Sequence, residues 1–318
     1  MTLVVLTQAS SGAPAMEGVN GSMNAVLNWA LTHTSLGADA WAREFHNGPT
    51  NESIFRAASG NRFRLYVRHD SSASGGAQRC IIRGCESASA YNTRTDEFPT
   101  SSQVPDSQSN WLASSTADGT DRNYIVLVSA TWVALFVQAD GTSWEMGFFG
   151  DVLGGESGDA YDTVCMVRNV TTTTVTLAVH PLQNVPTSTS TVFWARDISG
   201  AFKSSRGWLQ SSGTSIGTCG TTPAYKGGYN NAIRREKISI GCIGSATTTT
   251  GTMVMMRRGW LPNIWQPLHS GIGGVGNGDT GADTPYHASS SFRILWSQAT
   301  GTTSFIIEES DTYSAPSG

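Results

Sequence analysis

The stretch NYIVLVSATWVALFVQADGTSWEMGFFG, residues 123–150, decides the fold. It predicts three short strands: an apolar run at 124–128, a second strand at 132–137, and the alternating WEMGFF. Asp140-Gly141 supplies the positive φ that a tight hairpin turn needs. Both faces of the second strand, WVALFV, are apolar, and such a strand is covered on both sides. The stretch therefore builds core and carries no obvious chemistry.

The composition of the whole chain agrees with strands. Charged residues make up 14% of the 318 residues, below the roughly 25% usual in soluble domains. Thr and aromatic residues, which favour strands, and Gly and Asn, which favour turns, take their place. The sequence predicts an all-β protein with one or two β-sandwich domains, long loops and one short N-terminal helix. We expect that helix at 22–34, capped by Ser22 or Asn20.

The length allows about two domains. We expect an N-terminal arm and helix at 1–45, a β-sandwich domain at 46–168 and a second β-rich domain at 169–318. A polar connection at 87–121 interrupts the first domain, and connections of that length tend to be functional or interfacial.

Charge and cysteine content narrow the environment. The net charge of −4 and the pI near 5.8 argue against nucleic-acid binding. Arg62, Arg64 and Arg68 alternate with apolar residues, so they are expected on the polar face of a strand. We expect no signal peptide and no membrane span, and folding in the cytosol. The five cysteines cannot all pair within the chain, and Cys80 and Cys85 would point to opposite faces, so free, buried thiols are expected.

Candidate chemistry is sparse. Four acids surround a glycine-rich loop, which fits a glycosidase pair, a calcium site or a solvated acidic turn: Asp151, Glu156, Asp159 and Asp162. His69-Asp70 beside Ser71 or Ser72 has the residue types of a catalytic triad, but a triad is defined in space rather than by adjacency. No motif with a mechanism behind it is present. We therefore expect no catalytic residue, no metal site and no cofactor.

Aromatic residues in expected loops are the most suggestive surface feature. Such side chains stack on sugars, anchor protein interfaces, or plug the ends of a sandwich. The candidate ligand-binding or interface residues are Trp208, Tyr225, Tyr229, Trp260 and Trp265.

Several segments, taken in order, resemble a family of virion structural proteins of tailed phages, of the Mu-like and siphophage type. The helical stretch NAVLNWAL also fits, whereas 169–235 matches nothing in that family. The resembling segments are RCIIRGCE (79–86), EFPTSS (97–102), TWVALFVQ (131–138), FGDVLGGESGDAY (149–161) and RGWLPNIWQPLH (258–269).

The resemblance implies a non-enzymatic virion component, with no catalytic residues to carry over. We expect a tail or baseplate protein in multiple copies, a homo-oligomer that contacts other tail or baseplate proteins. The alternatives are a module of the tail that binds a host glycan or receptor, and a head decoration protein.

Overall fold

The computed structural model describes residues 2–70, 76, 78–106, 109–141, 144–154, 160–168, 191–194, 208–210, 235–243, 255–267, 280–283, 287–296 and 304–309. Within them the protein is all-β, with antiparallel sheets and two short helices. The helices are α1 (Ser22–Leu31) and the 3-10 helix η1 (Thr34–Asp39).

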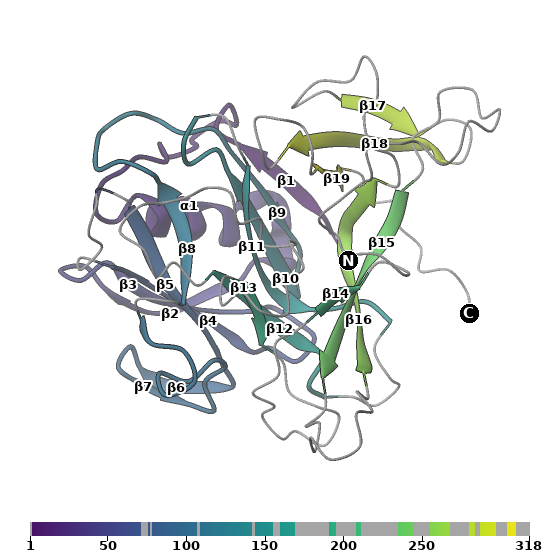
Figure 1. The fold of residues 1–318 in the computed structure, drawn as a ribbon. Helices are drawn as coiled ribbons and strands as arrows, with labels where there is room; N and C mark the ends of the chain where they lie inside the picture. Colours follow the sequence, from purple (N-terminus) through teal and green to yellow (C-terminus); the bar gives the residue numbers. More distant parts are fainter. Residues whose placement is uncertain are drawn as a thin grey trace.

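The strands form a large sheet, a small sheet and a separate hairpin (Figure 1). The hairpin consists of β6 (Ser87–Ala90) and β7 (Thr93–Thr95). In spatial order the large sheet contains β1 (Val4–Thr7), β9 (Tyr124–Val128), β10 (Trp132–Val137), β11 (Glu145–Asp151), β12 (Thr163–Arg168), β8 (Asn110–Ser114), β5 (Gln78–Cys85), β4 (Arg64–His69), β3 (Glu52–Arg56) and β2 (Ala42–Asn47), and β13 (Thr191–Trp194) pairs with β12. The small sheet contains β14 (Trp208–Gln210), β15 (Arg235–Ile243), β16 (Met255–Pro267), β19 (Ser304–Glu308), β18 (His287–Trp296) and β17 (Thr280–Asp283).

The three strands expected at 123–150 form a meander in the large sheet. β10 pairs with β9 through Val133↔Val128 and with β11 through Val133↔Phe149. Gly141 has φ 80° in the second turn, the conformation for which glycine was predicted. The prediction for this stretch is confirmed, with the third strand at Glu145–Asp151.

The two faces of β10 belong to different hydrophobic cores. Helix α1 packs on one face of the large sheet, and the small sheet covers β9–β12 on the other (Figure 1). Leu135 lies in the first core, whereas Phe136 lies in the second with Leu261 and Ile307 of the small sheet. Both faces of β10 are apolar because each is buried, as the sequence predicted.

A smaller cluster lies on the outer face of β3–β5. It joins Ile54, Tyr66 and Ile81, with Phe45 and Ala88 packed against it. Ala88 comes from β6, and the β6–β7 hairpin projects at the lower left of Figure 1. The hairpin thus contacts the sheet through Ala88, and the sequence of the hairpin does not predict this contact.

The first 45 residues belong to the large sheet and its core rather than to a separate arm. β1 pairs with β9, β2 pairs with β3, and Met23 and Leu27 of α1 are buried in the first core. An apolar helix face needs a partner, and one face of the large sheet provides it.

The predicted helix cap is wrong. The N-cap is Gly21, with φ 90° and no side-chain capping bond. Ser22 instead accepts a bond from the Glu17 amide and donates to the Ala15 carbonyl, while Asn20 accepts from Asn51. Both predicted caps are engaged with segments outside the helix.

Two expected connections contain strands. The polar stretch 87–121 includes the β6–β7 hairpin and the buried strand β8. The stretch around Trp260 and Trp265, two of the aromatic residues expected in loops, continues strand β16 as far as Pro267. β15 pairs Lys237 with Trp265 and Ser239 with Trp260, so the residues between the two tryptophans bulge, and Asn263 there has φ 55°. Pro262 is tolerated because its missing N–H falls in this bulge.

Candidate functional site

Three of the five candidate aromatic residues lie on the two strands of the small sheet that flank β15. Trp208 is in β14 opposite Gly241, and Trp260 and Trp265 are in β16, on the far side of β15. The expectation that these tryptophans lie in loops is therefore wrong. Tyr225 and Tyr229 fall outside the described residues.

Trp260 and Trp265 are partly exposed, and each also contacts the protein. A Cβ added to Gly154 would meet the ring of Trp260 at 2.1 Å, so this ring packs directly on that backbone. The indole N–H of Trp265 donates to Oε2 of Glu308 at 3.1 Å. The two rings are held in place and present part of their surface outside the core.

The two sheets are connected by a short backbone ladder, which we call the sheet junction: residues 152–154 and 259–260. Leu153 and Trp260 exchange two backbone hydrogen bonds, at 2.9 and 2.8 Å. Gly259 has φ 144°, and a Cβ there would lie 2.6 Å from the Leu153 carbonyl oxygen. Only glycine lets the two backbones approach this closely.

Asp151 stands at the base of the sheet junction. Its carboxyl accepts bonds from the Asn61 amide at 3.0 Å and from the Thr163 hydroxyl. Asn61 Nδ2 also donates to Asp162 and to Thr163. Burial raises the pKa of Asp151, against the lowering effect of the bonds from Thr163 and Asn61. The turn between β3 and β4 is thereby tied to the ends of β11 and β12.

This geometry tests two interpretations of the acidic loop, the solvated turn and the metal site, for the residues that the structure describes. The Asp151 side chain is partly buried and accepts bonds from Asn61 and Thr163, so it is not a freely solvated acid of a turn. Glu156 and Asp159 lie outside the described residues. Among the residues that the structure describes, no group of three His, Cys, Asp or Glu side chains is placed to hold a metal ion.

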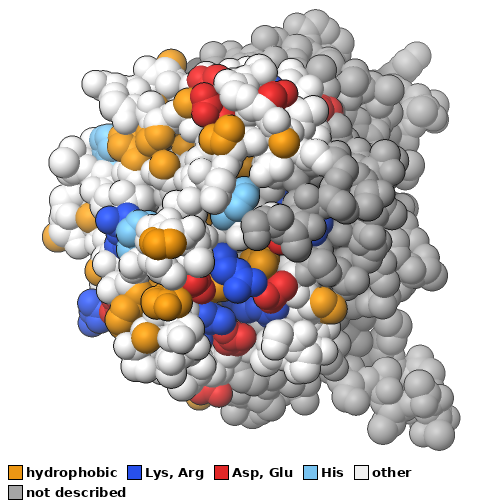
Figure 2. Space-filling view, turned by 90° about the vertical axis from the view of Figure 1, so that its left-hand side faces the viewer, with side chains coloured by type: hydrophobic (Ala, Val, Ile, Leu, Met, Phe, Trp, Pro, Cys, Tyr) orange, Lys and Arg blue, Asp and Glu red, His pale blue; other side chains and the backbone are white. Residues whose placement is uncertain are grey.

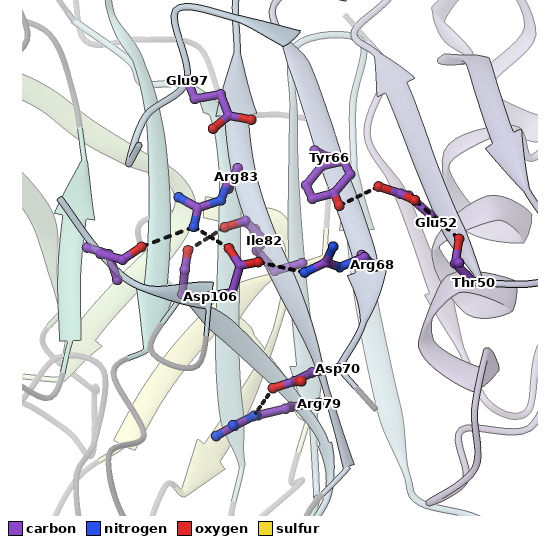
Figure 3. Close-up of polar contacts among 12 residues, drawn as sticks. Thr50, Glu52, Tyr66, Arg68, Asp70, Arg79, Ile82, Arg83, Glu97 and Asp106 are labelled. Atoms are coloured by element: carbon purple, nitrogen blue, oxygen red, sulfur yellow. Dashed lines mark hydrogen bonds and ion pairs between the residues drawn. The ribbon is translucent and has the colours of Figure 1, made fainter. Parts of the chain in front are cut away.

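An ion-pair network covers the outer face of β4 and β5 (Figure 3). Arg83 is only 1% exposed and donates to the carbonyls of Pro99 (2.6 Å) and Val104 (3.0 Å) and to Asp106. Asp106 also accepts from Arg68 at 2.6 Å. Burial opposes ionisation of Asp106, but the bonds and charges of Arg83 and Arg68 outweigh it and lower its pKa. The segment 99–106 is therefore fastened to the sheet by charge.

A second part of the network holds the hairpin. The Tyr66 hydroxyl donates to Glu52, and the Arg94 guanidinium lies 3.8 Å from the centre of the Tyr66 ring. Burial, and then the bond to Glu52, raise the pKa of Tyr66. Burial disfavours the charge of Arg94, yet its bond to Glu97 and the neighbouring charges raise its pKa. On the face in Figure 2, basic and acidic side chains lie beside one another.

The prediction that the arginines of 62–68 line a polar strand face is confirmed for Arg64 and Arg68, which lie on β4. Their partners were missed. Arg94, Glu97 and Asp106 belong to the polar stretch 87–121, where nothing in the local pattern shows which strand they face.

The remaining candidate groups have structural partners. Asp70 binds Arg79 at 2.8 Å, with both side chains buried, and Ser71 and Ser72 lie outside the described residues. Burial lowers the pKa of His69. Cys80, Cys85 and Cys165 are free and buried, as predicted, and burial raises the pKa of Cys80 and of Cys85 to about 12. In the described residues no helix is long and apolar enough to cross a membrane.

No protein-family model and no curated protein matches this sequence. Fold and side-chain geometry define the class: an all-β protein of a large and a small antiparallel sheet, joined by a glycine-dependent ladder and braced by ion pairs that include the buried Arg79 and Arg83.

Proposed function

We propose that this chain is a non-enzymatic structural protein of a phage virion, a tail or baseplate component that assembles in multiple copies in the host cytoplasm. The sequence resemblance motivates the proposal. The observation that carries it is that resembling segments far apart in the sequence contact one another in the structure.

Two pairs of resembling segments are in direct contact. FGDVLGGESGDAY and RGWLPNIWQPLH form the sheet junction through Leu153 and Trp260. RCIIRGCE and EFPTSS meet through two backbone bonds between Gly84 and Phe98, at 3.0 and 2.8 Å. The ring of Phe98 also stacks on Phe149, with 6.2 Å between centroids. Segments used as joints between core elements are what a scaffold protein requires.

The mechanism is assembly. Sheets give a rigid body, and a composition with few charged residues and partly exposed aromatic rings suits burial by neighbouring subunits. Repeated copies around a symmetric tail would bury the same surface each time.

Mass spectrometry and imaging of purified particles test the proposal. We expect the chain in every particle at several copies, with a label inserted after Gly119 appearing on the tail. Particles that lack the chain would refute the proposal, and a label on the capsid would favour the head decoration alternative.

A host-glycan or receptor-binding module of the tail is the second candidate, favoured by the three tryptophans on the two strands that flank β15 in the small sheet. Trp265→Ala tests it, with Phe45→Ala in β2, an edge strand of the large sheet, as a matched control. Particles that assemble but adsorb poorly to host cells only with Trp265→Ala support glycan binding. Failed assembly with this variant supports the scaffold.

A further inference from the structure

Trp265 of the small sheet lies on the face of that sheet that points away from the large sheet. In β16 its neighbour Ile264 belongs to the second core, and successive side chains of a strand point to opposite faces. The register agrees, because Ile264 pairs with Ile307 of the same core, whereas Trp265 pairs with Ile306. The Trp265 ring is partly exposed on this outer face.

Glu308 is the buried polar partner of this ring. It lies two residues beyond Ile306 in β19, on the same face as Trp265. Glu308 is only 2% exposed, and its Oε2 accepts the indole N–H of Trp265 at 3.1 Å. Among the described residues no cation forms an ion pair with Glu308, and Arg293 of β18 binds Glu309 at 2.7 Å. Within the described ranges, the Glu308 carboxylate is therefore devoted to the tryptophan.

A buried carboxylate is a costly partner for an indole, because it must lose its water. An apolar side chain at position 308 would fill the same space without that cost. The carboxylate adds direction, since a hydrogen bond to a charged acceptor is strong and constrains the angle at the donor. The bond fixes the orientation of the ring and hence the part of the ring that stays exposed.

The same bond decides what the exposed part of Trp265 can recognise. An indole has one polar hydrogen and no acceptor, and Glu308 already takes that hydrogen. The exposed part therefore offers an apolar aromatic surface, which packs on C–H groups rather than on a hydrogen-bonding group. Within a glycan, the C–H face of a sugar ring fits such a surface.

We propose that Glu308 is a positioning residue that holds the Trp265 ring in the orientation in which it stacks on the C–H face of a sugar. The inference rests on the glycan-binding candidate given above, and it adds to that candidate a second residue and the kind of contact made with the ligand. Glu308 is buried, so it acts through Trp265 and does not touch the sugar.

Two measurements on the full-length chain test this role: binding to polysaccharide purified from the surface of host cells, and solvent exchange of the Trp265 indole N–H by NMR. The resonance is assigned as the one that Trp265→Phe lacks. Glu308→Ala is expected to weaken binding about two- to tenfold, the range for one side chain that must be ordered on binding, and to speed exchange of the N–H. Glu308→Gln keeps an acceptor, so it should retain most of the binding.

Glu309→Ala is the matched control, because Glu309 is the next residue along β19, is partly exposed and binds Arg293 rather than a tryptophan. It should leave both measurements unchanged. If Glu308→Ala exchanges the N–H as slowly as wild type, or if Glu308→Gln loses as much binding as Glu308→Ala, the positioning role is refuted while glycan binding stands. A wild-type chain that binds no polysaccharide refutes glycan binding and the stacking role together.

Glu308→Gln decides the matter alone should Glu308→Ala fail to fold. A neutral amide oxygen accepts a weaker hydrogen bond than a carboxylate does, so the Trp265 N–H must exchange faster in this variant than in wild type. An unchanged exchange rate would show that the Glu308 carboxylate does not hold the ring.

Discussion

At the scale of single residues, several glycines of this protein are required by what lies against them. Gly147 interrupts the apolar alternation of β11, and a Cβ there would lie 2.4 Å from the ring of Trp111. That ring is buried, and its N–H donates to the Met166 carbonyl at 2.6 Å, so it cannot move aside freely. The absence of a side chain at Gly147 leaves the space that the Trp111 ring occupies.

Gly147→Ala is therefore expected to destabilise the protein by about 1–3 kcal/mol through overpacking. The free energy of unfolding in urea measures the effect. Gly119→Ala is the control, because an added Cβ at Gly119 meets nothing within 4 Å. Equal stability of the two variants would contradict this account of Gly147.

Asp106→Asn is expected to cost about 1–2 kcal/mol at pH 7, because it removes the carboxylate that compensates the buried Arg83. The cost stays below that of a fully buried pair, since the Asp106 side chain is 45% exposed and solvent screens the interaction. The pKa of Asp106 is lowered in the fold, so its contribution is present above the ordinary pKa and is lost as the pH falls through the lowered one.

Urea unfolding at several pH values provides the internal control for this variant. Wild type and Asp106→Asn should differ at pH 7 and converge in strong acid, where Asp106 is protonated in both states. A difference that stays constant with pH would show that the ion pair contributes nothing.

At the scale of elements, β10 is the strand that both cores share. Its hydrogen-bonded neighbours β9 and β11 lie on its two edges, α1 faces one side and the small sheet faces the other. Such a strand stabilises both cores, because successive side chains point to opposite faces and each face is buried in a separate core.

We expect Leu135→Ala and Phe136→Ala to be destabilising to a similar extent, about 2–5 and 3–5 kcal/mol, because both side chains are at most 1% exposed. Thermal and urea unfolding measure both. Ser89→Ala, on the exposed side of β6, should leave stability unchanged. If only one of the two β10 variants were destabilised, one face of the strand would have to be open to solvent.

At the scale of the whole molecule, the small sheet covers part of one face of the large sheet. It covers apolar side chains of β9–β12 with its own Leu261, Ile264, Leu295 and Ile307. The boundary expected near residue 168 remains a prediction, but the contact across it is a hydrophobic core and not a flexible link.

A chain truncated after Arg168 is therefore expected to expose the second core. We predict stronger binding of a hydrophobic dye, self-association, and a lower unfolding temperature than for the full chain. Dye fluorescence and light scattering measure these properties. A truncated chain as stable and monomeric as the full one would show that the two sheets fold independently.

Local patterns in the sequence by themselves determined the strands of the 123–150 meander, the helix near the N-terminus of the chain and the free state of the three described cysteines. Period-two alternation and turn residues express preferences of the backbone over a few residues, so they can be read without a partner. The tertiary structure alone decided that Trp260 and Trp265 lie in a strand, that β8 sits inside a polar stretch, and that Arg83 is compensated by Asp106. Each of these depends on hydrogen bonds or charges from residues far along the chain, and no local pattern contains that information.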